Sequence, residues 1–381
     1  MASQYRLLSA DSHLEISPDR WTKRVTAKYR DRAPRLVKLA NGGDGIIVEG
    51  RPLYVVGLAI AGKPYERHEL SGVNYEGSEG AGSPAQRLTE QDQDGVDGEV
   101  LYTSASNLSF WRGIKDDDAY LSVVHAYNTF LADEYCAANR DRLIALGAMP
   151  THSADAAIKE LEYCARAGLK GMMLNTFPSA KSYPSLEDDR FYAAALDLCM
   201  PLSVHVSMQL PDGPLFKYDK DPGEVAFGGD PIRVLTRFGG NSGLNAVQLL
   251  LSGVFDRLPK LKIYWAETQM GWLPYYYDQL DDVYKRSKHW MERYFDLKPM
   301  KKQPSEYFRE HCYWGFIYDR LGLRLRYDVG VDRIMWGNDF PHSAGDWPNS
   351  QRVIADTFAG VPDDEKRKIL ADNAVDYFHL N

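Results

Sequence analysis

The 381-residue sequence predicts an α/β fold, specifically a (β/α)8 barrel with loop insertions. The main observation is that eight short apolar runs, each the length of a buried strand, alternate with longer segments of helical periodicity. The second is that the glycine-rich phosphate-binding motifs of doubly wound sheets, G-x-G-x-x-G and G-x-x-x-x-G-K-[ST], follow none of these runs. The alternation alone also permits an open doubly wound sheet, which is the alternative fold.

The eight runs are mostly apolar, as expected for barrel strands, which are buried on both faces. In chain order they span residues 5–13, 99–103, 144–150, 171–177, 201–207, 261–267, 311–316 and 333–339. Helical patterns fill the segments 116–138, 153–167, 187–198, 231–255, 273–294 and 362–378. Ser153 and Asp363 stand at the starts of two of these segments, and both residue types favour helix N-termini.

Two irregular stretches interrupt the alternation, and neither has the character of a separate domain. Residues 41–83 are rich in glycine and predict an insertion with a small hairpin. Residues 209–227 carry the Pro, Gly and Asp punctuation that is typical of a loop over a site. We therefore expect one barrel domain over residues 1–381 with these two insertions.

The composition argues against nucleic-acid and membrane partners. The chain has 45 Lys and Arg against 53 Asp and Glu, and its longest basic run, residues 366–368, directly follows three acidic residues. No apolar run approaches the roughly 18 residues of a membrane span, and the N-terminus lacks the apolar stretch of a signal peptide. Four widely separated cysteines form no C-x-x-C pair. We expect a cytoplasmic protein with a small-molecule substrate.

Several of the predicted strands end in side chains that can bind a metal ion or a proton. They are Asp11, His13 and Glu15 on the first strand, His205 on the fifth, Glu267 on the sixth and Asp339 on the eighth. Active sites of (β/α)8 barrels lie at the carboxyl ends of the strands, where these side chains would converge. Asp11 and His13 on the first strand would meet His205 and Asp339 from distant strands. This convergence favours a functional site over separate pairs of core residues.

The first strand is the most informative of these. Asp11, His13 and Glu15 are two residues apart, so they would point to the same side of the strand. Ionisable groups that face an apolar interior need compensation, and a divalent cation is a common way to provide it. The alternative is that Asp11 and His13 simply pair with each other while Glu15 lies in solvent.

Taken together, these residues resemble the amidohydrolase superfamily, in particular its amidohydrolase-related branch of aminocarboxymuconate semialdehyde decarboxylase-like and γ-resorcylate decarboxylase-like enzymes. The resemblance rests on Asp11-Ser-His13, on His205 and on the motif Trp336-Gly-Asn-Asp339-Phe-Pro-His342. Arg87-Leu88, Asp94-Gly-Val-Asp97 and Gly271-Trp-Leu-Pro274 support it. The resemblance implies the barrel fold and a tendency to form homo-oligomers.

The resemblance also implies a divalent metal ion, zinc or manganese, held by some or all of Asp11, His13, His205 and Asp339. Such an ion would serve hydrolysis or the non-oxidative decarboxylation of a small carboxylated or aromatic substrate. Asp339 would act as a ligand or a proton shuttle, and His342 would orient the substrate or cap its loop. We take Asp339, Glu267 and His342 as the catalytic candidates.

The sequence departs from the family pattern at two positions, which keeps other functions open. Glu15 replaces the second histidine of a His-x-His pair, and Glu267 replaces a histidine after the sixth strand. The resulting oxygen-rich cluster is also suited to two iron or manganese ions, as in a dinuclear oxygenase of the same superfamily. A third alternative is a non-catalytic subunit of a hetero-oligomeric metal-enzyme complex.

Overall fold

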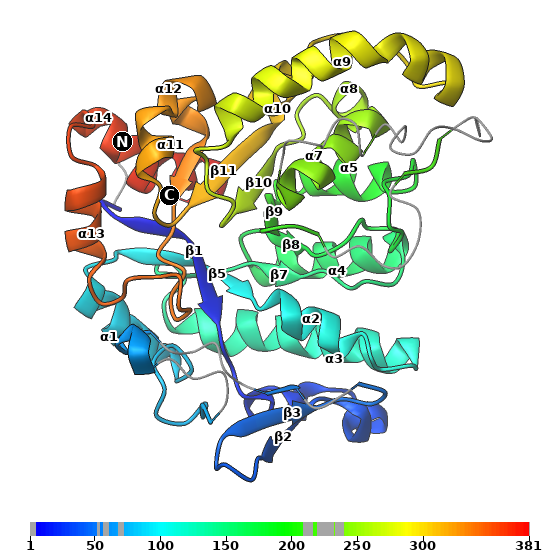
Figure 1. The fold of residues 1–381 in the computed structure, drawn as a ribbon. Helices are drawn as coiled ribbons and strands as arrows, with labels where there is room; N and C mark the ends of the chain where they lie inside the picture. The colour runs from blue at the N-terminus through cyan, green and yellow to red at the C-terminus, as the bar shows by residue number, and fades with distance from the viewer. Residues whose placement is uncertain are drawn as a thin grey trace.

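The computed structural model describes residues 5–51, 54–55, 61–67, 72–208, 216–218, 232 and 240–380. All eight predicted strands are present within these ranges (Figure 1). They are β1 (Leu8–Leu14), β5 (Gly98–Thr103), β6 (Leu143–Ala145) with β7 (Gly147–Ala148), β8 (Met172–Leu174), β9 (Leu202–His205), β10 (Ile263–Ala266), β11 (Cys312–Phe316) and β12 (Ile334–Trp336). Most of the predicted runs are longer than the strands, whereas β5 begins one residue before its run and β1 ends one residue after its run.

The strands are parallel and form a closed ring. One set has the order β1-β5-β6 and the other the order β7-β8-β9-β10-β11-β12. β6 and β7 are joined through Leu146, whose N–H donates to Leu101 O of β5 at 3.1 Å. At the other edge the chain after β12 meets β1, because the Asp339 N–H donates to Asp11 O (2.9 Å) and the His13 N–H donates to Phe340 O (2.7 Å). The predicted (β/α)8 barrel is confirmed.

Helices surround this ring, as the alternation predicted (Figure 1). The predicted segments contain α3 (Asp117–Phe130), α4 (Ala154–Ala167), α5 (Asp189–Asp197), α7 (Asn241–Ser252), α8 (Val254–Arg257), α9 (Leu273–Phe295), α14 (Asp363–Arg367) and α15 (Asn373–Tyr377). Ser153 caps α4, since its Oγ accepts from the Ala156 N–H. Residues 231 and 233–239 of one predicted helix lie outside the described residues.

Further helices lie in segments for which no helical pattern was predicted. They are α1 (Pro84–Asp94), α2 (Ala105–Trp111), α10 (Pro304–His311), α11 (Arg320–Arg324), α12 (Arg326–Val329) and α13 (Ser350–Thr357). α1 has a complete N-terminal cap, because Ser83 Oγ accepts from the Gln86 N–H and Pro84 occupies the first turn. Gly95 then ends it in a left-handed conformation with φ 69°.

The first predicted insertion carries a small antiparallel sheet beside the barrel (Figure 1). β3 (Asp44–Ile47) and β4 (Tyr54–Val55) form the expected hairpin within residues 41–83, and β2 (Arg35–Lys38), which precedes the insertion, pairs with β3. Most of the second predicted insertion, 209–227, lies outside the described residues apart from 216–218.

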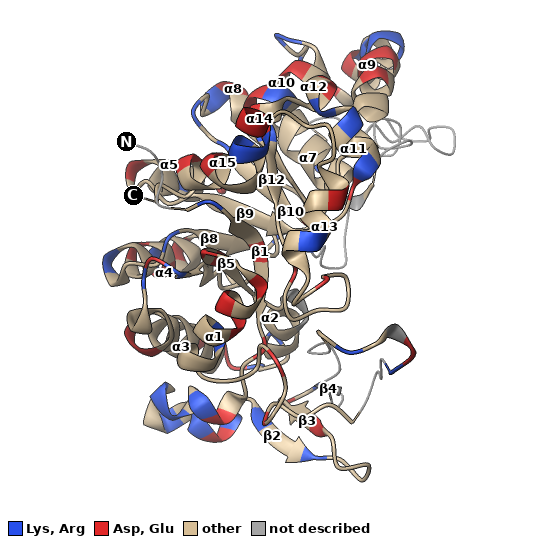
Figure 2. Ribbon diagram, turned by 90° about the vertical axis from the view of Figure 1, so that its left-hand side faces the viewer, with Lys and Arg blue, Asp and Glu red and all other residues tan. Residues whose placement is uncertain are grey.

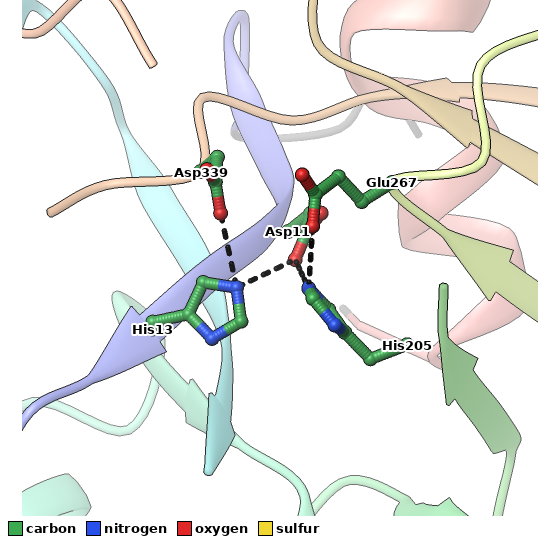
Figure 3. A group of neighbouring side chains, drawn as sticks. All are labelled: Asp11, His13, His205, Glu267 and Asp339. Atoms are coloured by element: carbon green, nitrogen blue, oxygen red, sulfur yellow. Dashed lines mark ion pairs between the residues drawn. The ribbon is translucent and has the colours of Figure 1, made fainter. Parts of the chain in front are cut away.

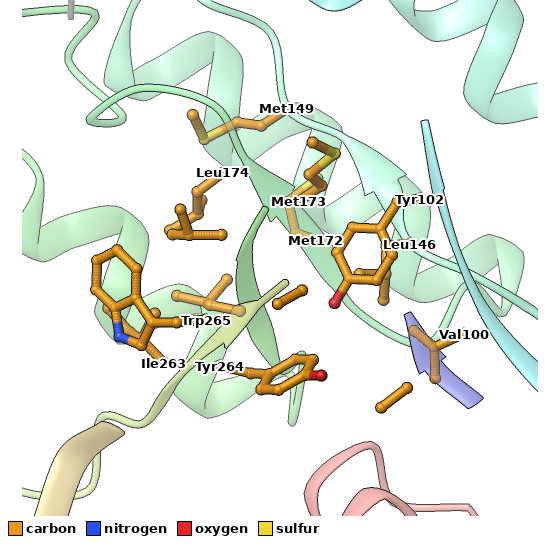
Figure 4. Packing of buried hydrophobic residues seen from close by; sticks show 14 of the residues in the cluster. Val100, Tyr102, Leu146, Met149, Met172, Met173, Leu174, Ile263, Tyr264 and Trp265 are labelled. Atoms are coloured by element: carbon orange, nitrogen blue, oxygen red, sulfur yellow. The ribbon is translucent and has the colours of Figure 1, made fainter. Parts of the chain in front are cut away.

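Large apolar and aromatic side chains from neighbouring strands pack together in the buried core (Figure 4). Leu146, Met172 and Ile263 are fully buried. Tyr102 and Tyr264 are also fully buried, and the Tyr102 hydroxyl lies 2.6 Å from Ser203 Oγ. Burial of each such apolar side chain contributes roughly 1.5–3 kcal/mol. The core therefore gives the carboxyl ends of the strands a rigid, apolar floor.

The outer surface carries charges of both signs. In the view of Figure 2, segments of basic and acidic residues are interspersed over the outer helices. None of the described helices combines the length and the apolar character that a membrane crossing requires.

Asn128 of α3 provides a test of how hydrogen bonds from the helices stabilise the barrel strands. Its side chain donates to Ala148 O at 2.9 Å and accepts from the Ala148 N–H at 2.8 Å, so it serves as a strand partner for β7. Asn128→Leu is expected to lower the free energy of unfolding by about 2–4 kcal/mol, because two buried backbone groups lose their hydrogen bonds. Denaturant unfolding measures this change, and a loss below about 0.5 kcal/mol would contradict the assigned role.

Candidate metal centre

Five of the predicted site residues come together at the carboxyl ends of the strands (Figure 3). Each offers one ligand atom, and these atoms all lie within 4.8 Å of one another. We refer to this group as the metal cluster; its members are Asp11, His13, His205, Glu267 and Asp339. The convergence predicted from four separate strands is therefore present in the structure.

Each member of the metal cluster is placed by a strand or by the turn that follows one. Asp11 and His13 lie two residues apart in β1, and His205 is the last residue of β9. Glu267 directly follows β10, and Asp339 lies three residues beyond the end of β12. The backbone hydrogen bond from Asp339 to Asp11 fixes these two carboxylates next to each other.

The imidazoles and carboxylates of the cluster contact one another directly. His13 Nε2 lies 3.0 Å from Asp339 Oδ1 and 3.6 Å from Asp11 Oδ1. His205 Nε2 lies 3.2 Å from Glu267 Oε2 and 3.6 Å from Asp11 Oδ1. Asp11 Oδ1 therefore lies between the two imidazoles (Figure 3).

The cluster is short of hydrogen bonds, which fits a metal ion. Within the described part of the chain, both oxygens of Asp11, both ring nitrogens of His13, Nε2 of His205 and Oδ1 of Asp339 are buried without a well-aligned hydrogen bond. Each such group costs roughly 1–3 kcal/mol when left unsatisfied. Ligands roughly 2.0–2.2 Å from one ion lie no more than about 4.4 Å apart, close to the span of this cluster. The donor set fits one divalent cation.

The backbone at this site adopts strained conformations. Glu267 has φ 54° and Asp339 has φ 52°, in the left-handed region that non-glycine residues rarely occupy. Val206, which follows His205, has φ 55°, and a β-branched residue is particularly unfavourable there. Strain of this kind costs on the order of 1–3 kcal/mol per residue and concentrates at functional sites.

Crowding of carboxylates perturbs their titration. Burial raises the pKa of Asp11 well above its usual value, and the Asp339 and Glu267 carboxylates raise it further. Burial and Asp339 raise the pKa of Glu267 to about 7. Burial also opposes ionisation of Asp339, but the bonds with His13 and His342 outweigh it and hold the pKa of Asp339 below its usual value. The cluster thus has an excess of negative charge that a cation would relieve.

The two imidazoles of the cluster are suited to metal binding. Burial lowers the pKa of His13, and burial together with the neighbouring His13 lowers the pKa of His205 well below its usual value. Both rings are therefore neutral at pH 7. A neutral imidazole is the form that binds metal ions.

Glu15 and His342 lie beside the metal cluster and contact each other. His342 Nε2 lies 3.1 Å from Glu15 Oε1, and His342 Nδ1 lies 3.4 Å from Asp339 Oδ1. The His342 ring stacks on His13 with centroids 3.9 Å apart. Burial alone would lower the pKa of His342, but the Asp339 and Glu15 carboxylates raise it to about 10. His342 is therefore an imidazolium held between two carboxylates.

Three buried polar residues behind the cluster were not predicted as functional. Arg87 Nε donates to Glu99 Oε2 at 2.6 Å, and the Asn338 side chain accepts from Ser12 Oγ at 2.7 Å. Arg87 and Asn338 stand in stretches that support the family resemblance, but their residue types alone carry no signal for this role. Polar residues in a helical segment are expected on a solvated face.

Comparison with known proteins identifies the family. The amidohydrolase family model matches residues 14–380, nearly the whole chain. The chain therefore belongs to the amidohydrolase family, a class of metal-dependent barrel enzymes. Among characterised relatives, γ-resorcylate decarboxylase of a Rhizobium species is 26% identical over 284 residues, covering 70% of this chain and 80% of that protein.

Solved structures share the fold. An amidohydrolase from Mycobacterium avium subsp. paratuberculosis superimposes with a TM-score of 0.70 at 19% identity, covering 99% of this chain and 100% of that chain. The 5-carboxyvanillate decarboxylase of Novosphingobium aromaticivorans, complexed with manganese and 4-hydroxy-3-methoxy-5-nitrobenzoic acid, superimposes with a TM-score of 0.65 at 18% identity. It covers 99% of this chain and 97% of its own.

The purified protein is expected to carry about one divalent ion per chain. Asp11→Ala removes the carboxylate between the two imidazoles and is expected to lower the bound metal at least about 10-fold. Elemental analysis of both proteins measures this. Asp346→Ala, an acidic residue of the loop after β12 outside the cluster, is the matched control and should keep its metal. Full metal content in Asp11→Ala would contradict the assigned cluster.

Proposed function

We propose that this protein is a metal-dependent, non-oxidative decarboxylase of a hydroxylated aromatic carboxylate. The observation that carries the proposal is the proton-holding pair of Asp339 and His342, which lies directly beside a cluster that fits one divalent ion. Several relatives support it, since they are named as decarboxylases of γ-resorcylate and of 2-amino-3-carboxymuconate-6-semialdehyde. We assign the metal ligands to Asp11, His13, His205, Glu267 and Asp339.

The bound cation would supply charge stabilisation for the carboxylate and phenolate oxygens of the substrate. The reaction breaks the bond between the ring carbon and the carboxylate carbon. Carbon dioxide leaves, the electron pair stays on the ring carbon, and that carbon takes up one proton. The protein must therefore deliver a proton to a single position on the substrate.

The Asp339 and His342 pair is placed to deliver this proton. His342 is protonated at neutral pH, and its Nδ1 lies 3.4 Å from Asp339 Oδ1, so the pair holds one proton at the edge of the metal cluster. Glu15 holds the other ring nitrogen and so fixes the orientation of the ring. We therefore assign Glu15 as the partner of His342, which differs from its sequence-based prediction as a metal ligand.

Glu267 occupies the position where the family pattern predicts histidine. Its Oε2 lies 3.2 Å from His205 Nε2, and its pKa is raised to about 7. It can therefore hold a proton at neutral pH in the metal-free site, or give it up to bind a cation. This supports its place in the ligand set and keeps it among the catalytic candidates.

Decarboxylation is expected with 2,6-dihydroxybenzoate or 5-carboxyvanillate as the substrate, and not with benzoate, which lacks the phenolic oxygen. Turnover is followed by the change in ultraviolet absorbance and by release of carbon dioxide from the manganese-loaded protein. His342→Gln is expected to lower kcat by about 100-fold or more while the protein keeps its metal, because general acid catalysis contributes about this much.

The matched control is His289→Gln, an exposed histidine of α9, which should leave kcat unchanged. Oxygen uptake is measured in parallel. Oxygen-dependent turnover with about two ions per chain would replace the proposal by the dinuclear oxygenase. A metal-loaded chain that is active only together with a second protein would support the subunit alternative.

Substitution of Glu15 is expected to change the pH profile. A group whose pKa is raised in the folded protein keeps its charge below that pKa and loses it as the pH rises, so the imidazolium of His342 persists to about pH 10. Glu15→Gln removes one of its two carboxylate partners and should move the alkaline limb of kcat about 1–2 pH units lower. Metal content should stay the same, and its loss would instead support Glu15 as a ligand.

A further inference from the structure

We infer that Arg87 is a positioning residue that holds together the two backbone segments carrying Asp11, His13 and Asp339. This inference rests on the proposed metal centre and concerns a residue outside the metal cluster. Arg87 lies on α1, and its side chain is only 1% exposed, as is that of its partner Glu99 on β5. A buried guanidinium needs hydrogen-bond acceptors for its N–H groups.

The guanidinium makes three bonds to three separate segments of the chain. Nε donates to Glu99 Oε2 at 2.6 Å, Nη1 donates to His13 O at 3.0 Å, and Nη2 donates to Phe340 O at 3.2 Å. The guanidinium carbon also lies 4.5 Å from the centre of the Phe340 ring. One planar group therefore ties α1 to β1, to β5 and to the loop after β12.

The two carbonyls that Arg87 binds belong to the segments that carry metal ligands. His13 is itself a member of the metal cluster, and Phe340 directly follows Asp339. The same two segments are linked by the hydrogen bonds from Asp339 N to Asp11 O and from His13 N to Phe340 O. Arg87 thus crosses the junction that closes the barrel, at the position where the ligands of the first and last strands meet.

Glu99 continues this arrangement toward Asn338. Glu99 Oε1 lies 3.3 Å from Ser12 Oγ and accepts from Asn338 Nδ2 at 3.4 Å, while Oε2 also accepts from Gln91. Asn338 precedes Asp339, and its Oδ1 accepts from Ser12 Oγ and from the Phe340 N–H. Ser12, which lies between Asp11 and His13, and Asn338, which precedes Asp339, therefore belong to one buried hydrogen-bond network that also contains Arg87.

A lysine cannot replace this guanidinium. Lysine keeps the positive charge that compensates Glu99, but its single ammonium centre lacks the planar fork that reaches two carbonyls and a carboxylate together. Arg87→Lys therefore keeps the charge that balances Glu99 but removes the hydrogen bonds that position the two segments. The expected consequence is a folded protein in which the His13 and Asp339 segments are less firmly held.

The test uses the full chain in its metal-free form, with Mn2+ alone as the probe. Titration calorimetry should show Mn2+ binding to Arg87→Lys that is about 10- to 100-fold weaker than to the wild type, as is typical when a group that supports a metal ligand is lost. Amide hydrogen exchange in the metal-free proteins should be faster at His13 and Asp339 in Arg87→Lys.

Arg326→Lys is the matched control. Arg326 is also a mostly buried arginine, whose Nε donates to Glu365 and whose Nη1 donates to the Leu323 carbonyl, but it joins α12 to α14. This variant should bind Mn2+ as the wild type does, within about two-fold. Should Arg87→Lys fail to fold, the double variant Arg87→Met with Glu99→Gln removes both charges together and should show the same loss of affinity.

Unchanged Mn2+ affinity in a folded Arg87→Lys protein would overturn the role of Arg87 and leave the metal centre intact. Equal losses of affinity in Arg87→Lys and Arg326→Lys would also overturn it, because the effect would then be one of general stability. Failure of the wild type to bind Mn2+ would instead overturn the metal centre itself, so the two failures are distinguishable.

Discussion

The structure depends on one electrostatic constraint, the burial of three carboxylates and two imidazoles at the carboxyl ends of the barrel strands. Asp11 and Asp339 are almost fully buried, and several of their polar atoms have no well-aligned hydrogen bond within the described chain. Such a cluster is unfavourable by itself, because buried charges of one sign repel each other and lose hydration. A divalent cation bound by these residues would stabilise the arrangement by offsetting their negative charge.

The buried cluster lies where the two ends of the barrel meet. Asp11 and His13 lie near the N-terminus, and Asp339 lies more than 300 residues later, yet their backbones are hydrogen bonded. The junction that closes the barrel is thus also the junction that assembles the ligands. Any loosening of this closure would separate the carboxylates of the first and last strands, which links the stability of the fold to the integrity of the site.

The sequence predicted the strands well because barrel strands are apolar on both faces and differ plainly from the helices between them. It predicted five members of the metal cluster because ionisable residues at strand ends are conspicuous in apolar runs. Glu15 was expected to continue the alternation of Asp11 and His13, but β1 ends at Leu14. The alternation does not extend past the strand, and Glu15 instead contacts His342.

The polar network behind the cluster could not be predicted, for a different physical reason. Arg87, Glu90, Gln91 and Asp94 recur at the spacing of one helix face, a pattern that is typical of a solvated surface. In the structure this face is buried, because Arg87 and Asp94 bond to backbone groups of β1, of the loop after β12 and of α13, which are far away in sequence. A single sequence shows the polar face of the helix but not the groups that form hydrogen bonds with it.

The glutamate at position 267 changes the charge balance of the site relative to a histidine. With Asp11, Asp339 and Glu267 all ionised, the cluster has a charge of −3, which one divalent cation does not neutralise. An anionic aromatic carboxylate would add to this excess. In the cation-free site Glu267, whose pKa is raised to about 7, can hold a proton, which lowers the negative charge of the three carboxylates by one. Glu267 can therefore hold a proton while the site is free of metal and give it up to a cation, to which it would offer oxygen where a histidine would offer nitrogen.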